Sequence, residues 1–294
     1  MNSGSEKTCT YVSSRGLMKS CSRYQRIIRS SNPYIRDDIL SDVNEGDTVY
    51  VCSTAIPMFT QQFLPRLMTR IVLVTGDADE APPYHVPSCI AIIKSPFIIR
   101  WFAQNCLLQH PKVVHLPIGL DYHTMAAGDS GWGLRQSPQE QEAAIMALEK
   151  TPFYDRLHKC YANFHFTIDR GDRREAYASV PKELVEYQQV STTRIETHKE
   201  QLKYAFVISP YGCGPDCHRT WEALVLGCIP IIKSSGLDPL FEGLPVLLVK
   251  QWSDVTQDLL DATLADFKTR TFAYEKLTLD YWRRAISEYA QLAH

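Results

Sequence analysis

The residues best suited to chemistry in this chain lie in one stretch, residues 204–233, which reads YAFVISPYGCGPDCHRTWEALVLGCIPIIK. Gly212 and Gly214 allow backbone conformations that side chains forbid, and His218 and Arg219 follow shortly after them. The apolar run before the glycines predicts a buried strand, and the residues after them predict a helix. A glycine turn between a strand and a helix N-terminus is suited to bind an anion, and phosphate is the anion that we expect.

This stretch is expected to form a βαβ unit. Residues 205–209 are the expected first strand, and residues 229–232 are the next. Asp216 is the expected N-cap of a helix over residues 219–224, and Gly227 stands where a helix C-cap should be. In such a unit the ligand lies at the carboxyl end of the strand, beside the helix N-terminus. The glycine turn and the first charged residues of the helix occupy that point.

Several kinds of anion or metal site do not fit this stretch. It lacks the Gly-Lys-Ser/Thr ending of a Walker loop. A dinucleotide fingerprint would need a glycine where Cys217 stands, and an acidic residue rather than Lys233 at the end of the next strand. Cys213, Cys217 and His218 do not predict zinc, because no second pair of ligands occurs at metal spacing.

A nucleotide-sugar site fits better. Arg219, in the first helical turn, can offer two donors to a diphosphate, and Glu222 on the same helix face can accept from both ribose hydroxyls. The competing interpretation is a solvated Arg219–Glu222 ion pair, which contributes only about 0.2–0.5 kcal/mol. We favour the nucleotide site, because Trp221 and Leu224 predict a half-buried helix on which lone charges are costly.

A second set of polar residues follows the expected strand at residues 160–166. Asn163 lies near the end of that strand, and Arg170, Arg173 and Arg174 come after it. One of these arginines is expected to supply a second cation, and the alternative is a solvated basic turn. The donor-binding residues that we expect are Ser209, Pro210, Tyr211, Gly212, Gly214, His218, Arg219, Glu222, Asn163, Arg170 and Arg174.

The rest of the chain alternates between strand and helix patterns, which predicts the α/β class. The further expected strands are residues 47–52, 70–75, 112–116 and 245–249. The expected helices are residues 56–67, 86–108 (with a break near Pro96), 139–150 and 173–179, and most of 255–289. We expect an acceptor-side domain over residues 1–155, a nucleotide-sugar-binding domain over 156–270 and a terminal helix over 271–294 that packs back on the first domain.

The composition limits the kinds of binding partner and the cellular compartment that we expect. A net charge of −2 gives no sign of the basic surface that nucleic-acid binding needs. The most apolar stretch, residues 89–106, contains Lys94 and Arg100 and is too short for a membrane span. Nine scattered cysteines indicate reduced thiols, and the first residues lack the apolar core of a signal peptide. We therefore expect a cytoplasmic protein with no nucleic-acid partner and no membrane span.

The sequence resembles a known family. The segment SPYGCGPDCHRTWEALVLGCIPIIK, followed by LDPLFEGLPVLLV and Trp252, is similar to the carboxyl-terminal half of exostosin-like glycosyltransferases, and is closest to the short forms carried by large algal viruses. The similarity is dense over residues 205–252, where HRTWEAL and LGCIPI are specific. Weaker similarity lies in VTGDAD (74–79), RWFAQN (100–105), LPIGLDYH (116–123) and YANFHF (161–166).

The resemblance implies a GT-B-like fold, with two Rossmann-like domains facing across a cleft and the donor held mainly by the second. It also implies inverting transfer of a sugar from a nucleotide donor to a glycan hydroxyl. UDP is the expected nucleotide, xylose is a plausible sugar, and no cofactor is required. Exostosins themselves carry a membrane anchor that this sequence does not show, so their compartment and substrates do not carry over.

Inverting transfer needs a base that takes the proton of the acceptor hydroxyl. Asp77 and Asp79 follow the strand at 70–75, and Asp121 and His123 follow the strand at 112–116. Polar residues just past strand ends are frequent site residues in α/β folds, and they are also common turn residues. Asp77 is the base that we expect, with the other three as alternatives.

Two other functions remain open. Asp77-Ala78-Asp79 also matches the Asp-x-Asp of metal-dependent GT-A glycosyltransferases, in which carboxylates hold a divalent cation that bridges the donor diphosphate. That interpretation conflicts with the second nucleotide motif, which a GT-A chain would not need. The chain could also be a non-catalytic nucleotide-sugar-binding module, and the four polar residues of the first half argue against this.

Overall fold

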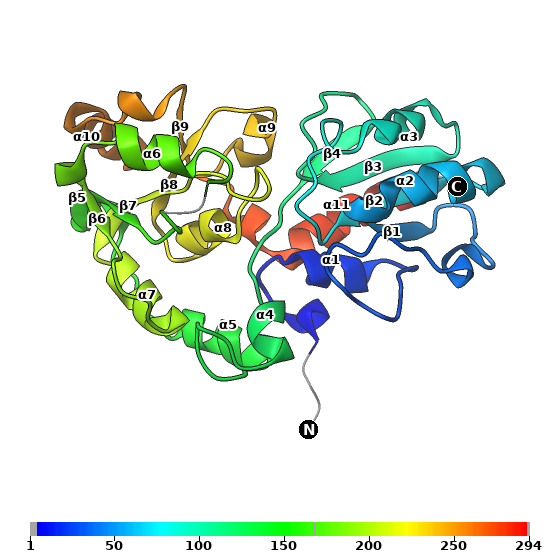
Figure 1. Cartoon of the computed structure of the whole chain (residues 1–294), viewed down its shortest axis with the longest axis horizontal. Coiled ribbons are helices and arrows are strands. Elements are labelled where there is room, and N and C mark those ends of the chain that lie inside the picture. The colour runs from blue at the N-terminus through cyan, green and yellow to red at the C-terminus, as the bar shows by residue number, and fades with distance from the viewer. Residues whose placement is uncertain (1–4, 167–168, 293–294) are drawn as a thin grey trace.

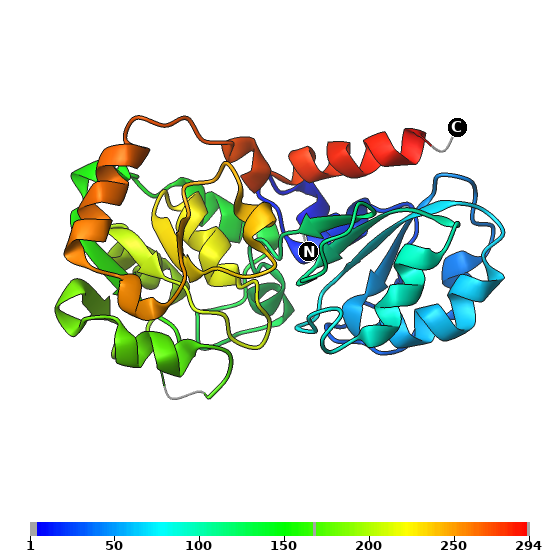
Figure 2. The same cartoon turned by 90° about the horizontal axis from the view of Figure 1, so that it is seen from above.

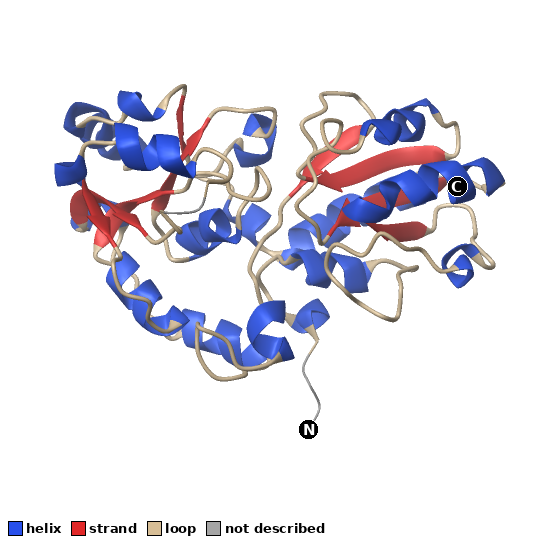
Figure 3. Ribbon diagram, viewed as in Figure 1, coloured by secondary structure: helices blue, strands red, loops and turns tan. Residues whose placement is uncertain are grey.

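The computed structural model describes residues 5–166 and 169–292 and contains two parallel sheets (Figures 1 and 3). The first sheet has the order β1-β2-β3-β4 and the second has the order β6-β5-β7-β8-β9, with all neighbouring strands parallel. The strands are β1 Thr48–Cys52, β2 Ile71–Gly76, β3 Ile98–Gln104, β4 Val113–Leu116, β5 Leu157–Ala162, β6 Val185–Tyr187, β7 Tyr204–Ile208, β8 Ile229–Lys233 and β9 Leu247–Val249. The α/β prediction is confirmed, and both sheets are Rossmann-like. We call the parts built on them the first and the second domain.

Helices pack on both faces of each sheet (Figure 1). In the first half of the chain they are α1 Ser14–Ser20, α2 Ile56–Met58, α3 Ile90–Lys94, α4 His123–Ala127 and α5 Pro138–Met146. In the second half they are α6 Arg173–Ser179, α7 Arg194–Gln201, α8 His218–Val225, α9 Asp238–Phe241, α10 Gln257–Phe267 and α11 Leu279–Gln291. Because both faces of each sheet are covered, β2 and β7 are buried along their whole length.

In the first sheet, alternate side chains of a strand pack against helices on opposite faces. In β2, Val72 and Val74 belong to the core that includes α1 and α11, whereas Ile71 and Leu73 belong to the core that includes α2 and α3. All four side chains are completely buried. The terminal helix α11 lies along the first sheet (Figure 2), and the ring of Tyr289 contacts the ring of Phe102 in β3.

The second sheet has a point at which its strand order reverses. The chain enters at β5, goes outward to β6, and then crosses back through α7 to β7 on the other side of β5. In open parallel sheets, ligands bind outside the carboxyl ends of the two strands at such a reversal. Here that place lies between the end of β5 and the glycine turn that follows β7.

One predicted element is wrong. We expected residues 86–108 to be helical, but only α3 and a short 3-10 turn before it are, and Ile98–Gln104 is the strand β3. Trp101 and Phe102 both have buried side chains and lie in different cores, as alternation along a strand requires. The β-branched and aromatic residues of this run favour a strand. We missed this preference because the whole segment is apolar, as a buried helix would also be.

Several boundaries also differ from expectation. The strand expected at residues 160–166 ends at Ala162, and the helix expected over 255–289 is divided into α10 and α11. The sequence did not predict β6 or α7. The C-cap residue of α8 is Leu226, one residue before the expected Gly227, but Gly227 does end the helix: its φ is +74°, and the N–H groups of Gly227 and Cys228 donate to the carbonyls of Leu224 and Ala223.

The two domains are joined by two chain crossings and by a shared core. The chain crosses between β4 and β5, through α4 and α5, and again between α10 and α11 (Figure 2). One apolar cluster contains Phe102 of the first sheet, Trp221 of α8 and Leu277 just before α11. Within the described residues no helix is long and apolar enough to cross a membrane.

Candidate functional site

The glycine turn after β7 contacts the carboxyl end of the first sheet. Asn105, directly after β3, is completely buried; its Oδ1 accepts the N–H of Asp216 at 2.9 Å, and its Nδ2 donates to the carbonyl of Ala78 at 3.1 Å. A Cβ at Gly214 would lie 2.7 Å from Asn105 Nδ2 and 3.0 Å from the carbonyl oxygen of Asp79. Only glycine therefore lets the turn approach the first domain this closely.

Asp216 holds this contact and does not cap the helix. The N-cap of α8 is Cys217, which makes no side-chain capping bond, so the expected N-cap role of Asp216 is wrong. The Asp216 carboxylate instead accepts the N–H of Ile118, in the first domain, at 2.7 Å and the Nε1–H of Trp221 at 2.9 Å. Burial raises the pKa of Asp216 to about 6, although these donors oppose the shift.

Two guanidinium groups meet at the same turn. Arg219 Nη1 donates to the carbonyl of Pro210 at 3.0 Å, and its guanidinium lies over the ring of Phe164. A Cβ at Gly212 would lie 2.2 Å from Arg173 Nη2, so this arginine rests on the glycine backbone. Burial lowers the pKa of Arg219, and the charge of Arg173 lowers it further. Among the described residues neither arginine has a carboxylate within 4.0 Å, so the pair is suited to an anion.

Of the other two arginines expected here, Arg170 contacts Cys213 of the glycine turn, and Arg174 pairs with an aspartate. Arg174 pairs with Asp169 at 3.3 Å on the exposed surface, and Arg170 Nη1 lies 2.8 Å from Cys213 Sγ, also exposed. The sequence named Arg173 as one of three and did not separate it from its neighbours. The contact that distinguishes it depends on how α6 is turned toward Gly212.

The remaining donor-side residues have local partners. Ser209 Oγ and Thr220 Oγ1 form a buried hydrogen bond of 2.8 Å that ties β7 to α8, while Tyr211 is 44% exposed. At the end of β5, Asn163 Oδ1 is buried, and no described residue bonds to it. An unsatisfied acceptor at the strand reversal is a point where a ligand could donate a hydrogen bond.

Glu222 is held by a residue that the sequence did not suggest. Arg194 Nη2, from α7, donates to Glu222 Oε1, and His198 Nε2 lies 3.8 Å from Oε2. Although burial opposes it, the charge of Arg194 and the proximity of His198 hold the pKa of Glu222 well below its usual range. The competing Arg219–Glu222 ion pair is not formed. Arg194 also donates to the carbonyl of Asp121, so it links α8 to the chain crossing.

The two aspartates that follow β2 have different surroundings. Asp77 is 7% exposed with a φ of +54°; its Oδ1 accepts the hydroxyl of Ser30 at 2.9 Å, and Arg15 Nε lies 3.7 Å from its Oδ2. Asp79 is exposed and lies against the glycine turn. Within the described part of the chain, no three His, Cys, Asp or Glu side chains form a group that could hold a metal ion.

Asp121 and His123 form a pair at the start of α4. Asp121 Oδ1 lies 3.1 Å from His123 Nδ1 and accepts the N–H of Thr124, whose hydroxyl donates to Oδ2. Burial would raise the pKa of Asp121, but His218, His123 and Thr124 together lower it. The ring of His218 lies 6.0 Å from that of His123, and His218 Nδ1 lies 2.7 Å from the carbonyl of Gly119. The first residues of α4 and α8, both histidines, therefore lie close together.

A scan against protein-family models found no matching family, and a search of curated proteins found no similar sequence.

Proposed function

We propose that this protein is a glycosyltransferase of the GT-B type, which transfers a sugar from a nucleoside diphosphate donor to a glycan hydroxyl with inversion. The observation that carries the proposal is the pair of arginines, Arg173 and Arg219, that rests on the glycine turn with no carboxylate of the described residues within 4.0 Å. A diphosphate would supply the missing negative charge through charge-assisted hydrogen bonds.

The position of this pair in the fold also supports a donor nucleotide. It lies at the strand reversal of the second sheet and at the N-terminus of α8, where the helix dipole favours negative charge. Glu222, one helical turn further on, is kept ionised and would accept the ribose hydroxyls. The resemblance of HRTWEAL and LGCIPI to exostosin-like enzymes favours UDP as the nucleotide and makes xylose a plausible sugar.

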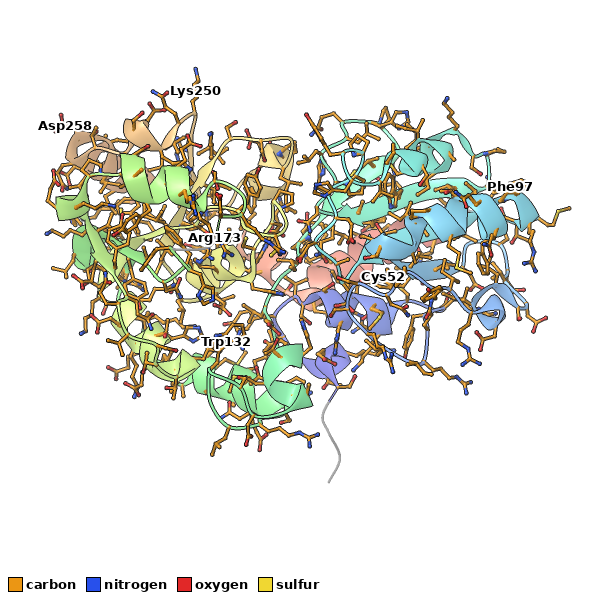
Figure 4. All side chains as sticks on the ribbon, viewed as in Figure 1. Cys52, Phe97, Trp132, Arg173, Lys250 and Asp258 are labelled. Carbon is orange, nitrogen blue, oxygen red and sulfur yellow. The ribbon has the colours of Figure 1, made fainter. Side chains whose placement is uncertain are left out.

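The two-domain arrangement supports the GT-B type. Both sheets are parallel and Rossmann-like, and the turn after β7 contacts the residues that follow β2 and β3. The carboxyl ends of the two sheets therefore face each other, and the first domain can present an acceptor to a donor held by the second. Side chains from both domains extend into the space between the ribbons (Figure 4).

The reaction needs a group that stabilises the leaving diphosphate and a group that takes the proton of the acceptor hydroxyl. The acceptor oxygen forms a bond to the anomeric carbon while the bond from that carbon to the diphosphate breaks, and the diphosphate leaves as an anion. Arg173, Arg219 and the start of α8 would stabilise the leaving diphosphate. The hydroxyl proton passes to a base of the first domain, for which the candidates are Asp77, Asp79, Asp121 and His123.

The first test is donor turnover across a panel of UDP- and GDP-sugars, each with excess EDTA and with manganese. Release of the nucleotide in EDTA supports the GT-B proposal and identifies the sugar. Strict dependence on manganese would favour the GT-A alternative, with Asp77 and Asp79 as metal ligands. Donor binding without turnover would favour a non-catalytic module, and neither binding nor turnover would reject the proposal.

A matched pair of variants tests the arginine site. Arg219→Ala should weaken binding of UDP by roughly 1.5–3 kcal/mol, because it removes a charge-assisted contact to the diphosphate. Arg174→Ala is the control, since Arg174 pairs with Asp169 on the exposed surface. Equal affinities of both variants and the unmodified protein, measured by calorimetry, would remove Arg219 from the site.

A further inference from the structure

The first residue of α4, His123, has an imidazole that lies beside a carboxylate. His123 Nδ1 lies 3.1 Å from Asp121 Oδ1, and the Asp121 carboxylate is fixed by the N–H and the hydroxyl of Thr124 at 2.9 and 2.7 Å. A carboxylate 3.1 Å from Nδ1 favours the tautomer that carries the proton on that nitrogen, which leaves Nε2 with its lone pair. Because 23% of the His123 side chain is exposed, a ligand can reach this imidazole.

The surroundings keep this imidazole neutral. Burial lowers the pKa of His123, Arg15 and His218 lower it further, and the carboxylates of Asp121 and Asp77 partly oppose them. Arg15 lies in α1 and His218 in α8, while Asp77 directly follows β2 and Asp121 lies just before α4, and the charge of each acts on the ring. A neutral imidazole with a free lone pair can accept a proton near neutral pH.

The position of the ring relates it to the proposed donor site. Its centre lies 6.0 Å from that of His218, the first residue of α8, and Arg219 follows directly. The His218 ring is itself fixed, because its Nδ1 lies 2.7 Å from the carbonyl of Gly119. His123 thus lies on the proposed acceptor side of the contact between the two domains. It is next to α8, the helix that would hold the diphosphate.

We propose that His123 is the general base of the transfer and that Asp121 is its positioning residue. This inference rests on the proposed function and replaces Asp77 as the expected base. As the acceptor oxygen bonds to the anomeric carbon and the diphosphate leaves, the hydroxyl proton passes to His123 Nε2. Asp121 keeps the ring in the required tautomer and stabilises the imidazolium that forms.

Asp77 is less suited to this role, on geometric grounds. Its Oδ1 already accepts the hydroxyl of Ser30 at 2.9 Å, and its Oδ2 faces Arg15 at 3.7 Å. Its backbone N–H donates to the hydroxyl of Ser14 at 2.9 Å, so the residue is held at both ends. We assign Asp77 to holding the segment around Ser30 over the end of the first sheet.

The test compares four variants in transfer assays, with UDP affinity measured in parallel by calorimetry. His123→Ala should lower kcat by about 10²–10⁴-fold and leave UDP affinity unchanged, since a base acts on the acceptor. His158→Ala is the matched control, because His158 Nδ1 lies at the same 3.1 Å from the carboxylate of Asp261 but on the exposed surface. Asp77→Asn should retain most of the activity.

The pH dependence separates a positioning role from a structural one. In the unmodified protein kcat/KM should fall at acid pH as His123 becomes protonated, and Asp121→Asn should move this fall to lower pH, because it removes a negative charge beside the ring. Transfer by His123→Ala within tenfold of the unmodified protein, or an unmoved acid limb in Asp121→Asn, would overturn the inference. Failure of the proposed function is distinguishable, since it would appear as absent UDP binding and absent transfer in the unmodified protein.

Discussion

Asp216 joins the two domains through its carboxylate, and replacing it measures how much that joint contributes to stability. Its oxygens accept the N–H of Ile118 at 2.7 Å and the Nε1–H of Trp221 at 2.9 Å, and both donors are buried. Asp216→Ala leaves these donors without an acceptor. Each buried, unsatisfied donor costs about 1–3 kcal/mol, so the free energy of unfolding should fall by roughly 2–6 kcal/mol.

The size of this loss should depend on pH. Burial raises the pKa of Asp216 from its ordinary 3.8 to about 6, so the folded protein holds the proton more tightly than the unfolded chain. The contribution of Asp216 to stability is therefore greatest below about pH 4 and declines as the pH rises through about 6. The step from 3.8 to about 6 corresponds to about 3 kcal/mol. Asp216→Ala should consequently destabilise the protein more at acid than at neutral pH.

Urea unfolding of both proteins between about pH 4 and about pH 7 tests this expectation. Asp169→Ala serves as the control, because Asp169 is exposed, pairs only with Arg174 among the described residues, and should change stability by less than about 0.5 kcal/mol at any pH. A loss for Asp216→Ala that stays constant over this range would refute the argument that a buried charge is involved. A loss below about 1 kcal/mol would show that the two donors find other acceptors.

Two further substitutions test the turn and the ribose contact. Gly214→Ala should lower stability by about 1–3 kcal/mol and weaken UDP binding, because its Cβ would lie 2.7 Å from Asn105 Nδ2, whereas Gly131→Ala has nothing within 4 Å and should do neither. Thermal unfolding and calorimetry measure both effects, and an unchanged Gly214→Ala protein would mean that the turn can move freely. Glu222→Gln should weaken binding of UDP but not of pyrophosphate, and equal losses for the two ligands would count against a ribose contact.

The central βαβ unit could be predicted from the sequence because its signals are local. Gly227 ends α8 with a positive φ, and the apolar runs on either side of α8 form β7 and β8. These features depend on the backbone needs of single residues and on short hydrophobic patterns. The strand β3 was missed because a buried strand and a buried helix segment are equally apolar, and periodicity cannot separate them over a short run.

The site depends on contacts that no local pattern encodes. Asp216 has the residue type and position of an N-cap, yet its acceptor capacity is used by Ile118, which is 98 residues away in the sequence. Arg194 lies in a helix with few apolar residues, and its role follows from Glu222 on another helix. Arg173 differs from Arg174 only in the direction that α6 gives it. Such assignments need the tertiary structure, because they depend on which helix faces and turns come into contact with one another.

Under the proposed function the glycine turn has two roles, and these would couple donor binding to the placement of the domains. On one side Gly212 receives the guanidinium of Arg173, and on the other Gly214 and Asp216 contact Asn105 of the first domain. An anion that binds Arg173 and Arg219 favours the conformation of the turn in which these contacts are made. It therefore also stabilises the contact between the two domains. Because such coupling is reciprocal, substitutions at Asn105 act on donor affinity without touching the donor. The proposed function therefore predicts that the first domain contributes to donor affinity, although its own residues lie on the proposed acceptor side.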